Sequence, residues 1–302
     1  GMTDELKIPQ VPSILGHSET PQPKLRRGQP TGERAVRYYV RKKKPKDELR
    51  PEERVPTEVQ GIQTDVVELG DLKALSPFHE VPGVNVGRIR PLRAGYSIGH
   101  YQVTAGTLGA IVWKQGWPWE AVLSNCHVLA NSISVQAPSR AGLWDAVLQP
   151  GPSDGGMSAD QIAWLFGWTP LVEGPDAANE VDRAWALLSY SVAYRIAPLR
   201  RPRLADLGLE VAKDGRTTGY TESRIFDTAA TLLVDYGLFT ARFIHQVIAM
   251  PGMGLPGDSG SLVRTREWNP VGLLFAGSSQ ATIVNPLDKV LADGLELVGI
   301  AS

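Results

Sequence analysis

The sequence predicts a mainly β protein: two packed β-barrels, a small α+β domain before them and a helix near the C-terminal end. Its 302 residues include 31 glycines and 23 prolines, a turn content that favours a β-rich fold over a helical bundle. From Gln102 onward, short apolar runs recur with turn residues between them, which is the spacing of barrel strands. Hydrophobic residues make up 42% and charged residues 21%, as is ordinary for a globular protein with a real core.

Residues 1–88 are expected to form an arm followed by a small accessory α+β domain. Proline and polar residues dominate the arm, and alternating side chains then predict two strands with a charged stretch between them. The predicted elements are an arm over 1–30, strands over 32–40 and 61–69, a short helix or turn over 45–54, and a basic connector over 88–95. The second domain is therefore placed at 89–302.

Eight apolar runs predict the strands of this second domain. They lie at 110–113, 121–123, 162–166, 184–188, 231–235, 243–250, 262–263 and 271–275. Asp214-Gly215 is a tight-turn signal within the stretch 213–220. A helix is predicted over 285–291, with Asn285 at the N-cap and Pro286 in its first turn.

Charge and cysteine usage bear on the compartment and on partners. Cys126 is the single cysteine, so no intrachain disulfide can form, which favours a reducing compartment. No apolar run approaches the length of a membrane span, and the N-terminal stretch lacks a signal pattern, so we expect a cytoplasmic protein without a membrane partner. Residues 24–54 hold 12 Lys/Arg against five Asp/Glu, which we interpret as a solvated strand and turn. No nucleic-acid partner is expected from so short a basic tetrad as 41–44.

The stretch Gly257-Asp258-Ser259-Gly260-Ser261 carries the clearest chemistry. Glycines on both sides of a serine allow a turn that exposes its hydroxyl and lets two backbone N–H groups converge on one point. Gly257 and Ser259 are the candidate donors of that oxyanion hole. A carboxylate at Asp258 can hold the loop in shape through a hydrogen bond or an ion pair. Because an isolated match can be only a turn, the motif requires a histidine and an aspartate upstream.

Both partners are present. His127 follows the apolar run 121–123, in what reads as a short helical turn at the end of that strand. A serine nucleophile needs such a base because a free hydroxyl is weakly nucleophilic at neutral pH. Asp182 precedes the run 184–188 and is the favoured third member, which would hold the imidazole by its second nitrogen. Asp160, which also opens a strand, is the rival. Either aspartate could instead cap a turn, and the histidine could be a core residue.

With His127, Asp182 and Ser259 in that order, the chain resembles the trypsin-like, chymotrypsin-fold serine peptidases over roughly residues 100–302. It is most similar to a disulfide-free bacterial branch like the plant narrow-leaf protease, through the stretches 124–129, 213–219 and 256–262. Two residues depart from the family pattern. Cys126 stands where many members have alanine, and Ser261 stands where secreted trypsins have glycine. Neither position is a catalytic group, and Cys126 is interpreted as a packed small residue.

The resemblance implies a chymotrypsin-like double β-barrel and a serine endopeptidase acting on a peptide or protein substrate through an acyl-enzyme. Met253 would form the floor of the substrate pocket, and Phe275, Ala276 and Gly277 its wall. No acid lies between Met250 and Gly257, so an apolar or small side chain is expected at the cleaved position. Met253 and Leu255 could instead be core residues.

No cofactor or metal is expected, since the histidines lack a ligand spacing such as H-E-x-x-H. The sequence leaves two alternatives to an endopeptidase. One is a catalytically silent protease-fold binding or scaffold protein. The other is an esterase of the α/β-hydrolase type, which is disfavoured because no histidine follows Ser259.

The family's activation by a newly cleaved amino terminus is not expected in this chain. Cleavage of that type would fall near residues 88–99, where no small, apolar start sequence occurs. We therefore expect residues 30–88 to stay attached as a folded unit. Asp258 would then be held by an internal partner, either a backbone N–H or a basic side chain.

Overall fold

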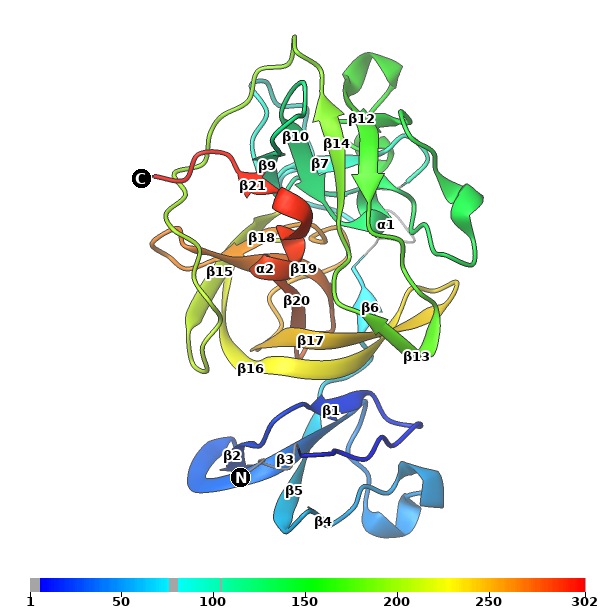
Figure 1. Ribbon diagram of the computed structural model, residues 1–302, viewed down its shortest axis with the longest axis vertical. Helices are drawn as coiled ribbons and strands as arrows, with labels where there is room; N and C mark the ends of the chain where they lie inside the picture. The colour runs from blue at the N-terminus through cyan, green and yellow to red at the C-terminus, as the bar shows by residue number, and fades with distance from the viewer. Residues whose placement is uncertain (1–5, 76–80, 104, 302) are drawn as a thin grey trace.

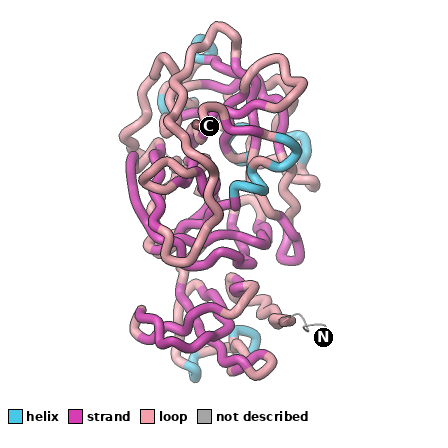
Figure 2. Tube along the Cα trace, turned by 60° about the vertical axis from the view of Figure 1, so that its left-hand side comes forward, coloured by secondary structure: helices cyan, strands magenta, loops and turns pink. Residues whose placement is uncertain are grey.

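The computed structural model describes residues 6–75, 81–103 and 105–301, and these are mainly β (Figures 1 and 2). The strands form one sheet of 13 strands and one of eight. The described residues contain two α-helices, α1 (Cys126–Leu129) and α2 (Leu287–Val290), each a single turn. Figure 1 shows the N-terminal unit at one end of an elongated molecule, with the two main bodies above it.

Six strands of the larger sheet close into a barrel. They are β15 (Glu210–Gly215), β16 (Gly219–Asp235), β17 (Thr240–Met250), β18 (Leu262–Arg264), β19 (Pro270–Gly277) and β20 (Thr282–Pro286). The ring runs β15-β16-β17-β20-β19-β18 and returns to β15, because β16 pairs with both β15 and β17. A closed ring leaves no exposed edge within it. We call it the C-terminal barrel.

The eight-stranded sheet forms the second body, which we call the N-terminal barrel. In pairing order its strands are β21 (Glu296–Leu297), β9 (Ala110–Trp113), β10 (Ala121–Ser124), β14 (Ala184–Leu188), β12 (Gln161–Trp168), β11 (Ala146–Leu148), β7 (Ser97–His100) and β8 (Gly106–Thr107). Only Leu108 and Gly109 separate β8 from β9 along the chain, so the sheet curls back on itself. The predicted mainly β, double-barrel fold is confirmed by these two sheets.

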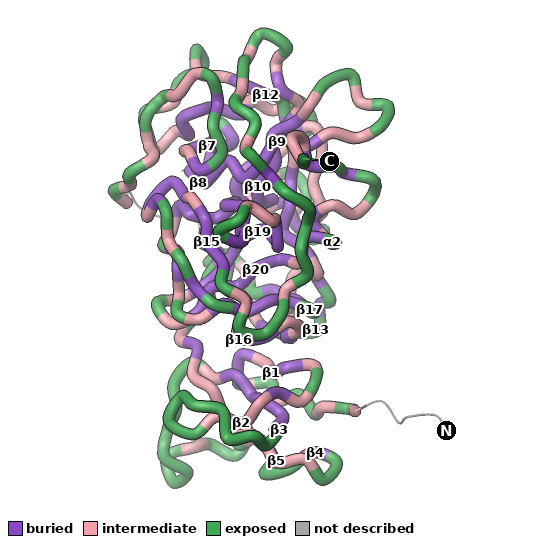
Figure 3. Tube along the Cα trace, turned by 90° about the vertical axis from the view of Figure 1, so that its left-hand side faces the viewer, coloured by how far each residue is buried: buried purple, intermediate pink, exposed green. Residues whose placement is uncertain are grey.

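The alternation of side chains along each strand explains which residues are buried in the barrel cores. In β14 the residues Ala184, Ala186 and Leu188 are buried, whereas Trp185 and Leu187 are half-buried. Strand β19 is buried along its whole length, because the barrel lies on one side of it and neighbouring segments lie on the other. Phe243 and Phe275 pack with ring centroids 4.6 Å apart, and full burial of such a side chain contributes about 1.5–3 kcal/mol. Figure 3 shows the buried residues concentrated in the two barrels.

The N-terminal unit extends the larger sheet. Its strands are β1 (Gly16–Ser18), β2 (Gln22–Arg26), β3 (Gln29–Val40), β4 (Glu58–Val59) and β5 (Ile62–Glu68). Strand β1 pairs with β3 on one side and with β16 on the other, so the unit is hydrogen-bonded to the C-terminal barrel. The helical part of the α+β prediction is reduced here to two 3-10 turns, Lys46–Glu48 and Pro51–Glu53. Pro45, Pro51 and Pro56 leave no room for a longer helix.

The chain leaves this unit well before residue 88. Strand β6 (Lys73–Ala74) already pairs with β19 and β16 of the C-terminal barrel. Residues 1–5 and 76–80 of the predicted first domain lie outside the described residues. The domain boundary at 88 therefore remains a sequence prediction, while the last strand of the N-terminal unit ends at Glu68.

The C-terminal helix is shorter than the prediction over 285–291. It begins at Leu287 and its N-cap residue is Pro286, without a side-chain capping bond. The prediction of Asn285 as the cap is wrong, because Asn285 belongs to β20 and its side chain serves Asp182 and Gln246 instead.

The remaining elements are short. They are β13 (Gly174–Asn179), which pairs in parallel with β17, and 3-10 turns at Pro138–Arg140, Pro152–Asp154, Ser158–Asp160 and Ala292–Gly294. In the part of the chain that the structure describes, no helix has the length and hydropathy to span a membrane.

Candidate active site

The predicted site residues come from both barrels. His127 lies on α1, directly after β10, and Asp182 lies just before β14, so both belong to the N-terminal barrel. Ser259 lies in the loop before β18 of the C-terminal barrel. Thr107 joins the two bodies, since its N–H donates to the Ser259 carbonyl (2.8 Å) and its hydroxyl donates to the Gly257 carbonyl (2.8 Å).

His127 and Asp182 form a buried hydrogen-bonded pair. His127 Nδ1 lies 2.6 Å from Asp182 Oδ2, so Nδ1–H donates to the carboxylate and leaves Nε2 as the acceptor nitrogen. The His127 backbone N–H donates to the other carboxylate oxygen at 3.3 Å. His127 Nε2 is buried and has no hydrogen-bond partner among the described residues. A ring held in this way presents a free basic nitrogen.

Two residues that the sequence analysis missed hold Asp182 from the other barrel. The Tyr236 hydroxyl donates to Asp182 Oδ2 (2.7 Å), and burial together with the nearby carboxylate raises the pKa of Tyr236 well above its usual value. The phenol therefore stays protonated and keeps donating. Asn285 accepts from the Asp182 backbone N–H at 3.0 Å. Tyr236 follows β16 and Asn285 lies in β20. Both are far from Asp182 in the sequence, and no local sequence pattern identifies them.

The rival aspartate lies elsewhere. Asp160 ends the 3-10 turn Ser158–Asp160, accepts from the Met157 N–H and pairs with Arg88 at 3.1 Å. It therefore serves as a turn-capping residue, and Asp182 is the aspartate that contacts His127.

Ser259 is buried, and its hydroxyl donates to the Phe275 carbonyl at 3.1 Å rather than to His127. The backbone around it has the expected left-handed glycines, with φ of 101° at Gly257 and 94° at Gly260. A Cβ at Gly260 would overlap the Ser124 hydroxyl, so only glycine fits there. The loop is thus formed, while the hydroxyl has another partner.

Asp258 is held by internal partners, as the sequence analysis expected. It accepts from the N–H groups of Thr217 (2.9 Å), Thr218 (3.1 Å) and Leu255 (2.9 Å), and from the Thr218 hydroxyl (2.7 Å). Lys213 lies 4.0 Å from it, and burial lowers the pKa of this lysine although Asp258 opposes the shift. The expected backbone donors and a basic side chain are both present. The hairpin between β15 and β16 thereby fixes the Ser259 loop.

The predicted oxyanion donor Gly257 already has an acceptor. Its N–H donates to the Leu75 carbonyl at 2.8 Å. The Ser259 N–H, the other predicted oxyanion donor, makes no hydrogen bond to the Leu75 carbonyl. A segment of the chain's own N-terminal half therefore reaches the Ser259 loop.

The predicted pocket residues contribute in different ways. Met253 is buried and packs with Leu75 and Leu274 in one apolar cluster. The Phe275 ring packs into the core against Phe243, so this residue offers its carbonyl rather than its ring. Ala276 and Gly277 offer the backbone of β19, which pairs with β6.

Cys126 is packed, as expected. Its thiol is buried and donates to the Ile133 carbonyl at 3.6 Å. Burial and the nearby Asp182 raise the pKa of the thiol well above its usual value, so it remains protonated and is a poor nucleophile.

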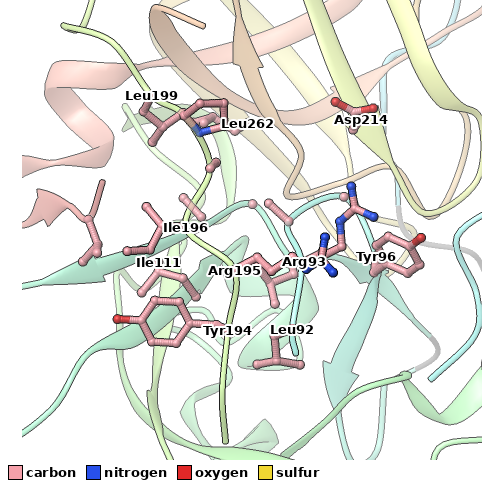
Figure 4. A pocket seen from close by; sticks show the side chains of 18 of the residues that line it. Leu92, Arg93, Tyr96, Ile111, Tyr194, Arg195, Ile196, Leu199, Asp214 and Leu262 are labelled. Carbon is pink, nitrogen blue, oxygen red and sulfur yellow. The ribbon is translucent and has the colours of Figure 1, made fainter. Parts of the chain in front are cut away.

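An open cavity lies away from these groups. Figure 4 shows this cavity of about 510 Å³, with Arg93, Ile111, Tyr194 and Asp214 in its lining. None of the described residues that line it is His127, Asp182 or Ser259. The described residues also contain no group of three His, Cys, Asp or Glu side chains able to hold a metal ion.

Comparison with known proteins gives distant structural likenesses only. No family model and no curated protein matches the chain. Among solved structures, it is similar to Thermobifida fusca protease A (16% identity over 68% of this chain and 97% of that chain, TM-score 0.47). It is also similar to Cellulomonas bogoriensis chymotrypsin (15% identity, 68% and 97% covered, TM-score 0.47) and to a glutamic acid specific serine protease (16% identity, 68% and 98% covered, TM-score 0.48). The likeness thus runs to bacterial trypsin-like and chymotrypsin-like serine proteases and concerns the fold.

Proposed function

We propose that the chain is a serine endopeptidase that cleaves peptide bonds through a His127–Asp182–Ser259 triad. The observation that carries the proposal is the buried His127–Asp182 hydrogen bond of 2.6 Å with Nε2 left unpartnered. The Ser259 loop, tied to the same barrel by Thr107, is the second support. Protease-fold neighbours are consistent with a peptide or protein substrate.

In the proposed reaction the Ser259 hydroxyl turns from the Phe275 carbonyl to His127 Nε2, which removes its proton during attack on the substrate carbonyl. His127 then protonates the leaving amine, and Asp182 stabilises the imidazolium and its tautomer. The N–H groups of Gly257 and Ser259 stabilise the oxyanion, each by about 2.7–4 kcal/mol where such donors have been removed. Water then hydrolyses the acyl-enzyme, and no cofactor or metal takes part.

The substrate pocket is proposed to accept an apolar side chain. Met253 and Leu274 supply its apolar surface, and Gly254 leaves space beside them. The carboxylate of Asp258 points away into the hairpin donors of Thr217 and Thr218, so it offers no charge to a basic side chain. We propose a cytoplasmic location, because a single buried cysteine suits a reducing compartment.

A catalytically silent binding protein with this fold is the second candidate. The bond from the Ser259 hydroxyl to the Phe275 carbonyl and the occupied Gly257 N–H favour it. A silent protein would bind peptides without turnover.

Labelling with a fluorophosphonate probe separates the two. An endopeptidase forms an adduct on Ser259 that disappears in Ser259→Ala and persists in Ser191→Ala, a change at an exposed serine. It also hydrolyses a fluorogenic peptide with leucine before the cleaved bond. The same assays are repeated on a variant in which a mutation displaces residues 73–75 from the Ser259 loop. If neither the adduct nor hydrolysis is observed in either protein, the silent alternative replaces the proposal.

A further inference from the structure

Residues 73–75 lie along β19 in an antiparallel register. Lys73 pairs with Gly277 and Ala74 with Ala276. Leu75 continues this register, since its N–H donates to the Phe275 carbonyl at 3.1 Å. Figure 1 shows β6 above the N-terminal unit and below α1, next to the C-terminal barrel. An extended peptide added to a strand in this way is a common mode of peptide recognition.

The carbonyl group of Leu75 lies at the candidate oxyanion donor. Its oxygen accepts from the Gly257 N–H at 2.8 Å, two residues before Ser259. A donor in this position polarises the carbonyl and makes its carbon more electrophilic. The backbone of Leu75 is thus bound on both sides, through its N–H by β19 and through its oxygen by the Ser259 loop.

The Leu75 side chain fills the apolar pocket. It is only 4% exposed and belongs to one cluster with Met253 and Leu274. A Cβ at Gly254 would lie 3.2 Å from Leu75 Cδ1, tighter than ordinary contact, so glycine leaves the space that the leucine occupies. The pocket that would receive a substrate side chain therefore holds a side chain of this chain.

The residues before Leu75 fasten the segment. The Leu72 carbonyl accepts from the Asp235 N–H at 2.9 Å, and Lys73 pairs with Asp235 of β16. Leu72 and Ala74 are buried in the same cluster as Val128 and Leu129, the residues that follow His127 on α1. The segment is thus hydrogen-bonded to β16 and buried in the cluster that also holds the two residues after His127.

We propose that the chain is its own substrate and cleaves itself after Leu75; this rests on the proposed endopeptidase function. Ser259 Oγ bonds to the Leu75 carbonyl carbon, and its proton passes to His127. The bond from that carbon to the amide nitrogen of Ser76 breaks, and the nitrogen takes the proton and leaves as an amine. Water then adds to the ester, so that Leu75 ends as a carboxylate and Ser259 regains its hydroxyl.

Cleavage there leaves the N-terminal unit attached without a covalent bond. Strand β1 pairs with β16 through three residue pairs, and the Leu233 N–H donates to the Leu15 carbonyl at 2.8 Å. This proposal departs from the expectation that residues 30–88 stay attached as one unit, because it divides that stretch after Leu75. The bond that would be cleaved lies before the stretch 88–99, where cleavage of the family's activating type would fall.

The test is the intact mass and N-terminal sequence of the purified full chain during incubation at neutral pH. We expect a fragment that begins at Ser76 and a partner that ends at Leu75, formed with a rate independent of protein concentration. Ser259→Ala stays intact, also when mixed with the wild type. Leu75→Asp slows cleavage on the order of 100-fold, because the carboxylate does not suit the apolar pocket. Leu204→Asp, at an 80% exposed leucine, cleaves like the wild type.

Labelling of the same samples separates the two proposals. Leu75→Asp should react with the fluorophosphonate at least as fast as the wild type, because its pocket is vacated; this also reports a folded site. A wild type that stays intact while Ser259 is labelled overturns self-cleavage and keeps the endopeptidase. Failure of labelling in both chains removes both proposals. Cleavage of Ser259→Ala, or cleavage at another bond only, overturns self-cleavage as well.

Discussion

The two halves of the candidate site differ in how complete they are. On the N-terminal barrel, His127 and Asp182 form a short hydrogen bond that Tyr236 and Asn285 support from the other barrel. On the C-terminal barrel, the Ser259 loop has its backbone shape, but its hydroxyl bonds to Phe275 and its Gly257 N–H bonds to Leu75. In the proposed triad, the His127–Asp182 pair presents an unpartnered Nε2, whereas the Ser259 loop is engaged by the chain itself. Regulation of such a site would act by releasing the Ser259 hydroxyl and the Gly257 N–H from their present partners.

The largest expected effect on kcat comes from removing either Ser259 or His127, one member from each half of the site. Ser259→Ala and His127→Ala should each lower kcat on the order of a millionfold, and the double variant should lose little more. The reason is that both groups act in one proton transfer. Steady-state hydrolysis of a leucyl peptide measures this, and two small, additive losses would show that the halves do not form one unit.

The next effect tests the base half alone. Asp182→Asn should lower kcat on the order of ten-thousandfold, because the amide favours the wrong imidazole tautomer. Asp160→Asn is the matched control, since Asp160 contacts Arg88 and the Met157 N–H instead of a histidine. A severe loss in Asp160→Asn with a mild one in Asp182→Asn would contradict the assignment.

A smaller effect is expected at Tyr236, which supports Asp182 across the barrels. Tyr236→Phe removes a hydrogen bond to a carboxylate, worth about 1.5–3 kcal/mol, and should lower kcat by about 10- to 150-fold. Tyr220→Phe is the control, because its hydroxyl bonds to Glu222 at the surface. Equal kinetics in the two variants would show that Tyr236 does not position the aspartate. Asp182→Asn combined with Tyr236→Phe should add little to Asp182→Asn.

The smallest effect concerns pH and the stability of the N-terminal barrel. Burial lowers the pKa of His100 below 6.5, although its bond to Asp145 opposes the shift. The unfolded chain then binds more protons than the folded one between that lowered pKa and 6.5, so stability falls as the pH drops through this window. One such group contributes a slope of at most about 1.4 kcal/mol per pH unit. Urea unfolding from pH 7 to pH 5 should show a shallower slope for His100→Gln, and an unchanged slope would contradict this assignment.

Sequence patterns predicted the parts of the fold that depend on local side-chain alternation. The runs 110–113 and 184–188 are β9 and β14 with the same bounds. The prediction failed where distant contacts decide. Asn285 has the chemistry of an N-cap, but pairing of β20 with β17 and β19 places it in a strand, where it bonds to Asp182.

The same distinction applies to the site. The carboxylate of Asp258 and its need for a donor could be predicted from the motif, and Thr217 and Thr218 supply it. The role of Leu75 could not be predicted, because nothing in the Leu-Lys-Ala-Leu sequence of residues 72–75 indicates that it pairs with β19. Register between strands that lie 200 residues apart leaves no mark in a local pattern.

Thr107 has a consequence for how the proposed activity would be lost. Its N–H and hydroxyl hold the Ser259 and Gly257 carbonyls, and its own carbonyl accepts from Ser124 at 2.7 Å. The bonds to Ser259 and Gly257 cross from one barrel to the other, whereas Ser124 lies in the same barrel as Thr107. A small separation of the barrels would therefore misplace the serine while each barrel stays folded. Turnover would then report the docking of two folding units, and it would disappear on warming before circular dichroism detects any melting.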